Sequence, residues 1–329
     1  MAGITLKKLS ELSGLSIRTV NRALKDQPEV SEANRKLVRQ LAEKYNYLPD
    51  MAARNFRLRR RNIVGILTCD RLANGALLQK ISDLERNLIA ADCYPVLGCS
   101  RDRDIRLILR EWHGIVGPVV SFCSPTPADG LAGLLENDPL SFIFIDCKPP
   151  DPRCHSISID RSAGIADAYR AMVAAGCRRI LHCGSISGRV ETVDRIAAGE
   201  LAGKAEFLRI FAVGEPEEGY RRAPEIIAAR CDAVFFDTDR MAAGFYRYAG
   251  ERGIRIPEDI RVVGFDDDPV SQFLPPPLSS VAHPVEEISR AVMEIISKQP
   301  EEPVRRTFPS RFLPRESFGR QCRTPEKRS

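Results

Sequence analysis

The sequence predicts an all-α helix-turn-helix head at the N-terminus, followed by an α/β body of two doubly wound parallel-sheet subdomains. Three observations predict this fold. Residues 1–62 hold 14 basic and 6 acidic residues, a net charge of +8, whereas the other 267 residues hold 35 basic and 38 acidic residues, a net −3. Leucines at helical spacing and a glycine-containing turn occupy the first fifty residues. Apolar runs then alternate with amphipathic stretches, the pattern of βα units.

Composition excludes several classes of protein. With 329 residues, of which 43% are hydrophobic, the chain can bury a large core divided over two or three domains. No window approaches the ~18 apolar residues that span a bilayer, and the first residues lack a secretory apolar segment. We therefore expect a cytoplasmic protein with no membrane partner. Ten cysteines without C-x-x-C spacing, and only four histidines, predict reduced core thiols and neither metal nor cofactor.

Three short helices are predicted in the head. Leucines at helical spacing lie on one face of a helix over residues 5–13. Gly14 follows, and glycine tolerates the positive φ that a tight turn between helices requires. Ser16 is a good N-cap for a second helix over residues 16–25, because its hydroxyl accepts from a free backbone N–H. Ser31 caps a third helix.

This arrangement is a helix-turn-helix, in which the start of the second helix faces base edges in the DNA major groove. We therefore predict base contacts from Ile17, Arg18 and Arg22, since Arg pairs with guanine and Ile meets a thymine methyl group. The smaller polar and basic side chains suit phosphate oxygens, which predicts backbone contacts from Thr5, Ser16, Thr19, Asn21, Lys25, Ser31 and Asn34. The alternative is an ordinary three-helix bundle with a solvated basic face.

The head resembles the LacI/GalR family of bacterial transcription regulators. The matching residues are Thr5-Leu6-Lys7, Gly14-Leu15-Ser16, Thr19-Val20-Asn21-Arg22, Pro28-Glu29-Val30-Ser31, Tyr47-Leu48-Pro49-Asp50 and Ala52-Ala53-Arg54. The chain departs from the family pattern at Asn21, where Ser is usual, and at Asp50, where Asn is usual. Asp50 adds a negative charge near the DNA, and its role stays open.

Residues 50–57 are similar to the family's hinge helix. The resemblance implies that these helices pair in a dimer and insert an apolar side chain into the minor groove, here Phe56, flanked by Ala53 and Arg57. A phenylalanine wedge can unstack a base step and kink DNA. The alternative is that Phe56 packs inward against the body. Four arginines within residues 57–61 add a basic linker.

The body repeats apolar runs and amphipathic stretches from Ile63 onward. The predicted strands cover residues 63–67, 94–97, 115–120, 142–145, 156–159, 179–181, 233–236 and 261–265, and the predicted helices cover residues 75–90, 102–112, 162–175, 216–229 and 240–252. About 250 residues with this alternation of strands and helices predict two parallel-sheet subdomains.

The body resembles the family's effector-binding core, which has the type I periplasmic-binding-protein fold. The matching residues are Ser158-Ile159-Asp160 with Gly164, Asp239-Arg240-Met241-Ala242, Ile256-Pro257-Glu258-Asp259-Ile260, Val263-Gly264-Phe265-Asp266-Asp267, Pro276-Pro277-Leu278-Ser279-Ser280-Val281, Pro284 and, for the last strand, Leu313-Pro314-Arg315-Glu316-Ser317. The resemblance implies a small-molecule effector, a sugar or related metabolite, bound between the subdomains.

The resemblance implies five effector-binding residues: Asn74, Asp160, Arg195, Asp239 and Asp266. Carboxylates suit sugar hydroxyls because each accepts more than one hydrogen bond. The alternative for each aspartate is a helix N-cap or a turn residue. The chain departs from the family pattern at Arg161, at Thr238 and in the spacing of Arg195 to Gly199, and its region 185–212 is shorter than usual. These departures leave three alternatives open: a non-standard cleft chemistry, an effector other than a sugar, or a regulator that needs no small molecule.

These observations divide the chain into a head (1–49), a hinge and linker (50–62), an effector-binding and dimerisation core (63–319) and a disordered tail (320–329). They predict a regulator, most simply a repressor, that binds a pseudo-palindromic operator as a homodimer or a tetramer. The alternatives are a cytosolic solute-binding protein and an α/β enzyme with a DNA-binding head. No nucleophile elbow or P-loop supports the enzyme, and the four histidines are scattered through the sequence.

Overall fold

The computed structural model describes residues 4–24, 26–45, 47, 62–68, 75–100, 104–123, 139–185 and 187–319. The chain divides into two compact units, residues 1–61 and residues 62–329. Several predicted features lie outside the described residues: Lys25, Asp50, the hinge residues Ala53, Phe56 and Arg57, the cleft residue Asn74, and the tail 320–329.

The first unit is a bundle of three short helices around a small apolar core. The helices are α1 (Leu6–Ser13), α2 (Ile17–Leu24) and α3 (Glu32–Lys44). Their buried side chains are Leu9, Val20, Ala23, Val30 and Val38. The predicted all-α head is confirmed, since each predicted helix is present with its boundaries displaced by one residue or so.

The second unit contains two six-stranded sheets. The first sheet has the order β11-β5-β4-β3-β1-β2, and its strands are all parallel: β1 (Ile63–Thr68), β2 (Tyr94–Cys99), β3 (Val119–Ser121), β4 (Phe142–Ile145), β5 (His155–Asp160) and β11 (Arg305–Pro309). The second has the order β12-β10-β9-β8-β6-β7, with β6 (Arg179–Cys183), β7 (Glu206–Ile210), β8 (Ala233–Phe236), β9 (Arg261–Asp266), β10 (Ser279–Ala282) and an antiparallel edge strand β12 (Arg311–Leu313).

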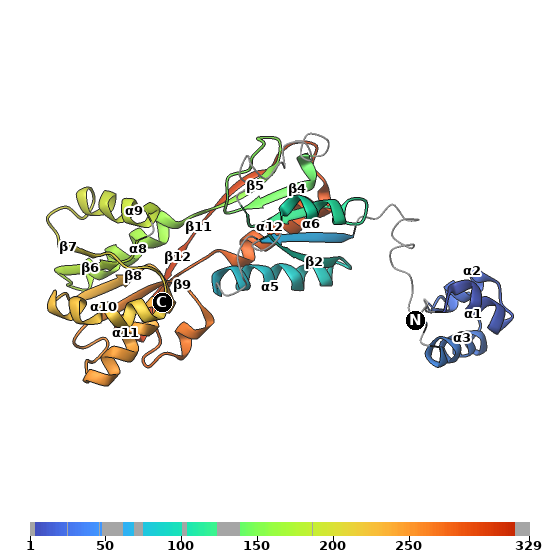
Figure 1. Ribbon diagram of the computed structural model, residues 1–329, viewed down its shortest axis with the longest axis horizontal. Coiled ribbons are helices and arrows are strands. Elements are labelled where there is room, and N and C mark those ends of the chain that lie inside the picture. The colour runs from blue at the N-terminus through green and yellow to red at the C-terminus, as the bar shows by residue number, and fades with distance from the viewer. Residues whose placement is uncertain are drawn as a thin grey trace, which may run out of the picture. The chain divides into compact units, whose positions relative to one another are not determined.

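Helices cover both faces of each sheet, as Figure 1 shows. In the first subdomain these are α5 (Gly75–Ala90), α6 (Ile105–Trp112) and α12 (Val285–Lys298), and in the second they are α8 (Arg161–Ala174), α9 (Ser187–Ala198), α10 (Pro216–Ala228) and α11 (Asp239–Arg252). Short 3-10 helices cover Pro139–Ser141, Pro269–Phe273 and Glu316–Phe318. The predicted doubly wound α/β body is confirmed. No helix of the described chain is long and apolar enough to cross a membrane.

Strand residues alternate between two apolar layers, because successive side chains point to opposite faces. In the second sheet Ile180, Phe235 and Val263 pack under α8 and α9. Their neighbours Leu181 and Val234 pack against α10 and α11 on the other face. A strand in a sheet that is covered on both faces has apolar side chains on both sides, so its sequence is a continuous apolar run. These strands could be predicted from such runs.

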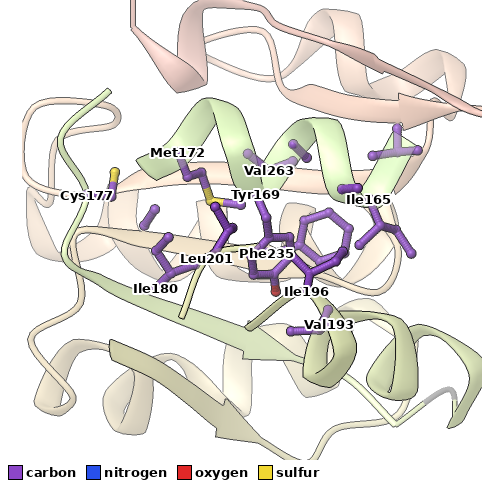
Figure 2. Packing of buried hydrophobic residues seen from close by; sticks show 14 of the residues in the cluster. Ile165, Tyr169, Met172, Cys177, Ile180, Val193, Ile196, Leu201, Phe235 and Val263 are labelled. Atoms are coloured by element: carbon purple, nitrogen blue, oxygen red, sulfur yellow. The ribbon is translucent and has the colours of Figure 1, made fainter. Parts of the chain in front are cut away.

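Tyr169 of α8 lies at the centre of the first of these layers (Figure 2). Its ring centroid is 5.3 Å from that of Phe235, in a tilted arrangement. The side chain is fully buried, and the hydroxyl has no hydrogen-bond partner among the described residues. Burial raises the pKa of this hydroxyl well above its ordinary value, so it stays protonated.

Some elements lie outside the sequence prediction. The pattern identified no α9, β7, β10, α12 or β11, and it extended β3 too far, to residues 115–120. β7 and β11 are edge strands with exposed residues along their length, so they lack an apolar run. β3 begins only after Pro118, which has no N–H to donate to a ladder. The match to a last strand is partly wrong, because β12 ends at Leu313 and residues 316–318 form a 3-10 turn.

Three chain crossings join the two subdomains, and Ser310 links two of these crossings. The chain crosses from β5 to α8, from β10 to α12, and from β11 through Ser310 to β12. The Ser310 hydroxyl lies 3.0 Å from the carbonyl oxygen of Asp160 and accepts the backbone N–H of Gly164 at 3.1 Å. A Cβ on Gly164 would lie 2.5 Å from Val281 and 2.7 Å from the Ser310 hydroxyl, so glycine is required there.

Eight cysteines lie among the described residues, and five of them are buried. Burial raises the pKa of Cys154 to about 11, of Cys183 to about 12 and of Cys231 to about 11. Thiols with these pKa values stay protonated at neutral pH and pack as small apolar groups.

Tyr169→Phe removes a buried hydroxyl that has no protein partner. We expect the free energy of unfolding to stay equal or to rise by up to about 1 kcal/mol, measured by urea unfolding of the full chain. Phe235→Ala, a control in the same layer, should lower it by about 3–5 kcal/mol. A loss of more than about 1 kcal/mol for Tyr169→Phe would show that the hydroxyl makes a stabilising hydrogen bond.

Gly164→Ala tests the packing of the crossings. The added methyl group overpacks the contact with Val281 and Ser310, and we expect it to destabilise the body by about 1–3 kcal/mol. Gly250→Ala is the matched control, because Gly250 is also helical but has open space at its Cβ position. It should stabilise the chain by up to about 1 kcal/mol. Equal effects of the two substitutions would contradict tight packing at Gly164.

Candidate functional site

The first turn of α2 presents an apolar and basic surface. α2 packs onto the head core through Val20 and Ala23, which are fully buried. Ile17 and Arg18 lie on the outward side; Ile17 is 46% exposed, and Arg22 one turn later is half-buried. An outward-facing first turn of this kind can enter a nucleic-acid groove while the rest of the helix stays packed.

The turn between α1 and α2 is held by local hydrogen bonds. Gly14 ends α1 with a φ of +68°, in the left-handed region that glycine favours. The Ser10 hydroxyl donates to the carbonyl oxygen of Leu15, and the backbone N–H of Leu15 donates to the Ser13 hydroxyl at 3.3 Å. These bonds fix the direction in which α2 leaves the turn, and so the direction in which Arg18 points.

Three hydroxyls predicted to contact phosphate also cap helices. Thr5 accepts from the backbone N–H of Lys8 at 3.3 Å, Ser16 from Thr19 at 3.1 Å and Ser31 from Asn34 at 3.4 Å. A capping hydroxyl still carries a hydrogen that it can donate. It also lies at a helix N-terminus, where free backbone N–H groups favour anions. The capping role and the predicted phosphate contact are therefore compatible.

A second polar site lies between the two subdomains of the body. We call it the inter-subdomain cluster, and it consists of Lys80, Asp146, Arg161, Arg189, Asp266 and His283. The residues come from α5, from the ends of β4 and β9, from α8 and α9, and from the crossing after β10. Carboxyl ends of parallel strands are where open α/β sheets place ligand contacts.

Asp266 is the central acceptor of the second subdomain's half. His283 Nε2 lies 3.0 Å from Asp266 Oδ1, and Arg189 Nη2 lies 3.5 Å from the same oxygen. The Arg189 guanidinium lies 3.8 Å above the ring of Phe265. The edge of the same ring meets the His283 imidazole, with centroids 5.4 Å apart. The Phe265 ring thus contacts both of the side chains that lie against Asp266.

Asp146 is the corresponding acceptor of the first half. Two guanidinium nitrogens of Arg161 donate to the Asp146 carboxylate, Nη1 at 2.8 Å. Lys80 Nζ lies 3.7 Å from Asp146 Oδ2, and the lysine side chain is only 7% exposed. Because Arg161 opens the helix that follows the crossing, this ion pair bridges the two subdomains.

Burial shifts the ionisation of the cluster. It lowers the pKa of Lys80 and of Arg189, with the nearby carboxylates acting in the opposite direction. Burial also lowers the pKa of His283, so the imidazole is neutral at neutral pH. A carboxylate only accepts, so His283 Nε2 must carry the proton that it shares with Asp266. Nδ1 is then left with a free lone pair, and it has no partner among the described residues.

The backbone is strained at the same strand ends. Asp146 has a φ of +58°, Asp266 of +103° and Asp267 of +51°. Non-glycine residues at positive φ are uncommon and collect at functional sites, where surrounding contacts hold them in place. The two central carboxylates of the cluster are therefore fixed by their main chain as well as by their ion pairs.

Direct contacts across the subdomains accompany the cluster. Gln79 of α5 donates to the carbonyl oxygen of Asp267 at 2.7 Å. A Cβ on Gly75, the first residue of α5, would lie 2.0 Å from a carboxylate oxygen of Asp268. The negative charge of Asp268 therefore lies at the positive end of the α5 dipole.

Two predicted effector residues have structural roles. Asp160 is the N-cap of α8 and accepts from the backbone N–H of Ser162 at 2.9 Å. Asp239 is fully buried; it accepts from the Ser280 hydroxyl and from the backbone N–H of Asp268, both at 2.7 Å. Burial raises the pKa of Asp239 well above its ordinary value. These geometries favour the alternative of cap and turn residues. Asp266 lies in the cluster, and its effector contact stays a prediction.

The predicted arginine needs a correction. Arg195 is exposed on α9, whereas Arg189 on the same helix is buried and reaches Asp266. Six residues of α-helix separate the two side chains by about 120° around the helix axis, so only one of them can face the cluster. The spacing of arginine to glycine in the family pattern pointed to Arg195, which does not face the cluster.

Sequence reasoning also missed Lys80, Asp146 and His283. Asp146 directly follows the apolar strand Phe142–Ile145, and that signal could have found it. Lys80 offers no local signal, because it is one lysine in an amphipathic helix. In the part of the chain that the structure describes, no three His, Cys, Asp or Glu residues lie close enough together to hold a metal ion.

Comparisons with known proteins agree with this geometry. A family model described as "Bacterial regulatory proteins, lacI family" matches residues 5–50, and a "Periplasmic binding protein-like domain" matches residues 169–318. The HTH-type transcriptional regulator CelR of Thermobifida fusca is 27% identical, over 95% of this chain and 98% of CelR.

Solved structures share the fold. The lac repressor dimer bound to operator and the anti-inducer ONPF matches with a TM-score of 0.75 and 19% identity, over 96% of this chain and 99% of the repressor. A CelR–cellobiose complex matches with a TM-score of 0.64 and 24% identity, over 95% and 99% of the two chains. With its helix-turn-helix head and its periplasmic-binding-protein-like body, the chain belongs to the LacI/GalR family of bacterial transcription regulators.

Proposed function

We propose that this chain is a sequence-specific transcription repressor of the cytoplasm, whose affinity for its operator is controlled by a small molecule at the inter-subdomain cluster. The observation that carries the proposal is the outward-facing first turn of α2, with Ile17 and Arg18 exposed on a head of the LacI type. The related CelR was solved with cellobiose and the lac repressor with operator, which supports both partners by analogy.

The crossings offer the route from effector to DNA. A ligand that binds groups from both subdomains favours the arrangement in which those groups converge. Arg161 and His283 belong to the cluster and lie on two of the three crossings. Effector binding would therefore act where the subdomains are joined. We propose that residues 50–62 form the hinge that passes this change to the head at 1–49, and that 63–319 form the core.

We further propose that the working unit is a homodimer on a pseudo-palindromic operator. Phe273 is 85% exposed and Val270 is 43% exposed on the same 3-10 turn. A hollow of about 520 Å³ lies nearby, lined among others by Tyr246, Leu274 and Pro275. Exposed large apolar side chains beside an apolar hollow are typical of a self-complementary interface.

Arg18→Ala tests the DNA surface. We expect operator binding to weaken by about 1–3 kcal/mol and specificity to relax at one base pair, because Arg pairs with a base edge. Genomic footprinting supplies the operator, and fluorescence anisotropy with single-base variants gives the free energies. Lys44→Ala, which removes the same charge from the last turn of α3, should weaken binding equally on all sequences. A uniform loss for Arg18→Ala would make Arg18 a phosphate contact.

Phe273→Glu tests the dimer. Burying a carboxylate in an apolar interface is unfavourable, so the dissociation constant of the dimer should rise about tenfold or more in sedimentation equilibrium. Leu107→Glu places the same charge on another exposed apolar residue, on α6, and should leave assembly unchanged. Unaltered assembly of Phe273→Glu would remove this turn from the interface.

A further inference from the structure

The inter-subdomain cluster contains one more positive than negative charge. Its cations are Lys80, Arg161 and Arg189, and its carboxylates are Asp146 and Asp266. His283 adds no charge at neutral pH, because burial lowers its pKa. Burial lowers the pKa of Lys80 and of Arg189, and the nearby carboxylates act in the opposite direction.

The surrounding carboxylates already have other partners. Asp160 caps α8, Asp237 contacts His182 and the backbone N–H of Ser185, and Asp267 pairs with Arg315 at 2.5 Å. Asp239 is fully buried on Ser280 and the backbone of Asp268, and Asp268 lies at the start of α5. Asp237 and Asp239 lie close enough to Arg189 to raise its pKa, but both carboxylates also accept hydrogen bonds from the other groups named above.

Arg189 also has unused hydrogen-bonding groups. The residue is 7% exposed, and its Nε and Nη1 have no partner among the described residues. Its remaining contact, from Nη2 to Asp266, is long at 3.5 Å. A guanidinium buried with two unsatisfied nitrogens is costly in the free protein, and a ligand that supplies acceptors would remove that cost.

The same site has acceptors for hydroxyl groups. The lone pair of His283 Nδ1 is free, and Asp266 Oδ1 is only partly used by its two neighbours. The cluster thus holds cationic hydrogen-bond donors, with a surplus of one positive charge, beside free hydrogen-bond acceptors. A ligand that matches both needs an anionic group and hydroxyl groups in one small molecule.

We propose that the effector is a sugar acid: a small polyhydroxy compound with a single carboxylate. Its carboxylate is bound by Lys80 and Arg189 with the support of Arg161, and its hydroxyls by Asp266 and His283. The surplus of one charge fits a monocarboxylate, whereas a phosphate monoester carries about −1.5 to −2 at neutral pH and overcompensates it. This proposal rests on the proposed function, in which the cluster is the effector site.

Matched ligand pairs test the charge requirement. The full-length protein is heated with D-glucuronate and D-glucose, D-galacturonate and D-galactose, D-gluconate and sorbitol, and with glucose 6-phosphate. We expect at least one sugar acid to raise the melting temperature by about 2 °C or more at millimolar concentration, and its neutral partner to have no effect. A neutral partner or the phosphate ester that binds as well as the acids, or no response to any acid, overturns the proposal.

Lys80→Met tests the surplus charge in the ligand-free protein. If Lys80 is a buried cation without a full anionic partner in the ligand-free protein, its removal should raise the melting temperature measured without ligand. It should also weaken binding of the sugar acid about tenfold or more in calorimetry. Lys298→Met, on the exposed end of α12, is the control and should change neither quantity. A lower melting temperature of ligand-free Lys80→Met would make Lys80 a structural partner of Asp146, and unchanged acid binding would overturn its role.

Operator binding is measured separately, without any sugar acid, on the footprinted site. If the unmodified protein does not bind DNA in a sequence-specific way, the proposed function is contradicted. The ligand pairs and Lys80→Met report on the cluster without DNA, so their failure concerns the sugar acid alone.

Discussion

The packing of the three chain crossings constrains the whole body. The two subdomains have separate apolar layers, and each sheet is complete in itself. One of the links between them is a compact group of atoms around Ser310, whose hydroxyl bonds to Asp160 and Gly164 on a different crossing. Because close-packed groups resist sliding past one another, we expect any movement between the subdomains to be a rotation about this point. The inter-subdomain cluster takes residues from both subdomains, so such a rotation would change its geometry.

Much of the fold could be predicted because its signals are local. Apolar runs identified the central strands, and Ser16, Gly14 and Ser31 identified the ends of the head helices. The place of Asp266 at a strand end could be predicted, because the apolar run 261–265 directly precedes it. Arg189 could not, because the choice between it and Arg195 depends on the rotation of α9 against the sheet. Asp146 directly follows an apolar strand and could have been found in the same way. Lys80 could not, because nothing in its amphipathic helix distinguishes it before its contact with Asp146 is known.

Residues that the sequence assigned to recognition cap helices or hold turns in both the head and the body. Thr5, Ser16 and Ser31 hold helix starts while their hydroxyls remain able to donate. Asp160 holds the start of α8, and Asp239 holds the loop after β9, beside the cluster rather than in it. A residue type that suits a ligand also suits a helix N-terminus, since both need an acceptor for N–H groups. The sequence therefore predicts the region of a binding site more readily than the individual side chains that form it.

The first subdomain is not continuous in the chain. Its sheet begins at Ile63, but its edge strand β11 and its helix α12 come from residues 285–309, after the whole second subdomain. The head needs only contacts within its first fifty residues. During synthesis from the N-terminus the head can fold as soon as it emerges, whereas the sheet that supports the cluster waits for nearly the last strand. A nascent chain can thus have a DNA-binding surface before it has any means of regulating it.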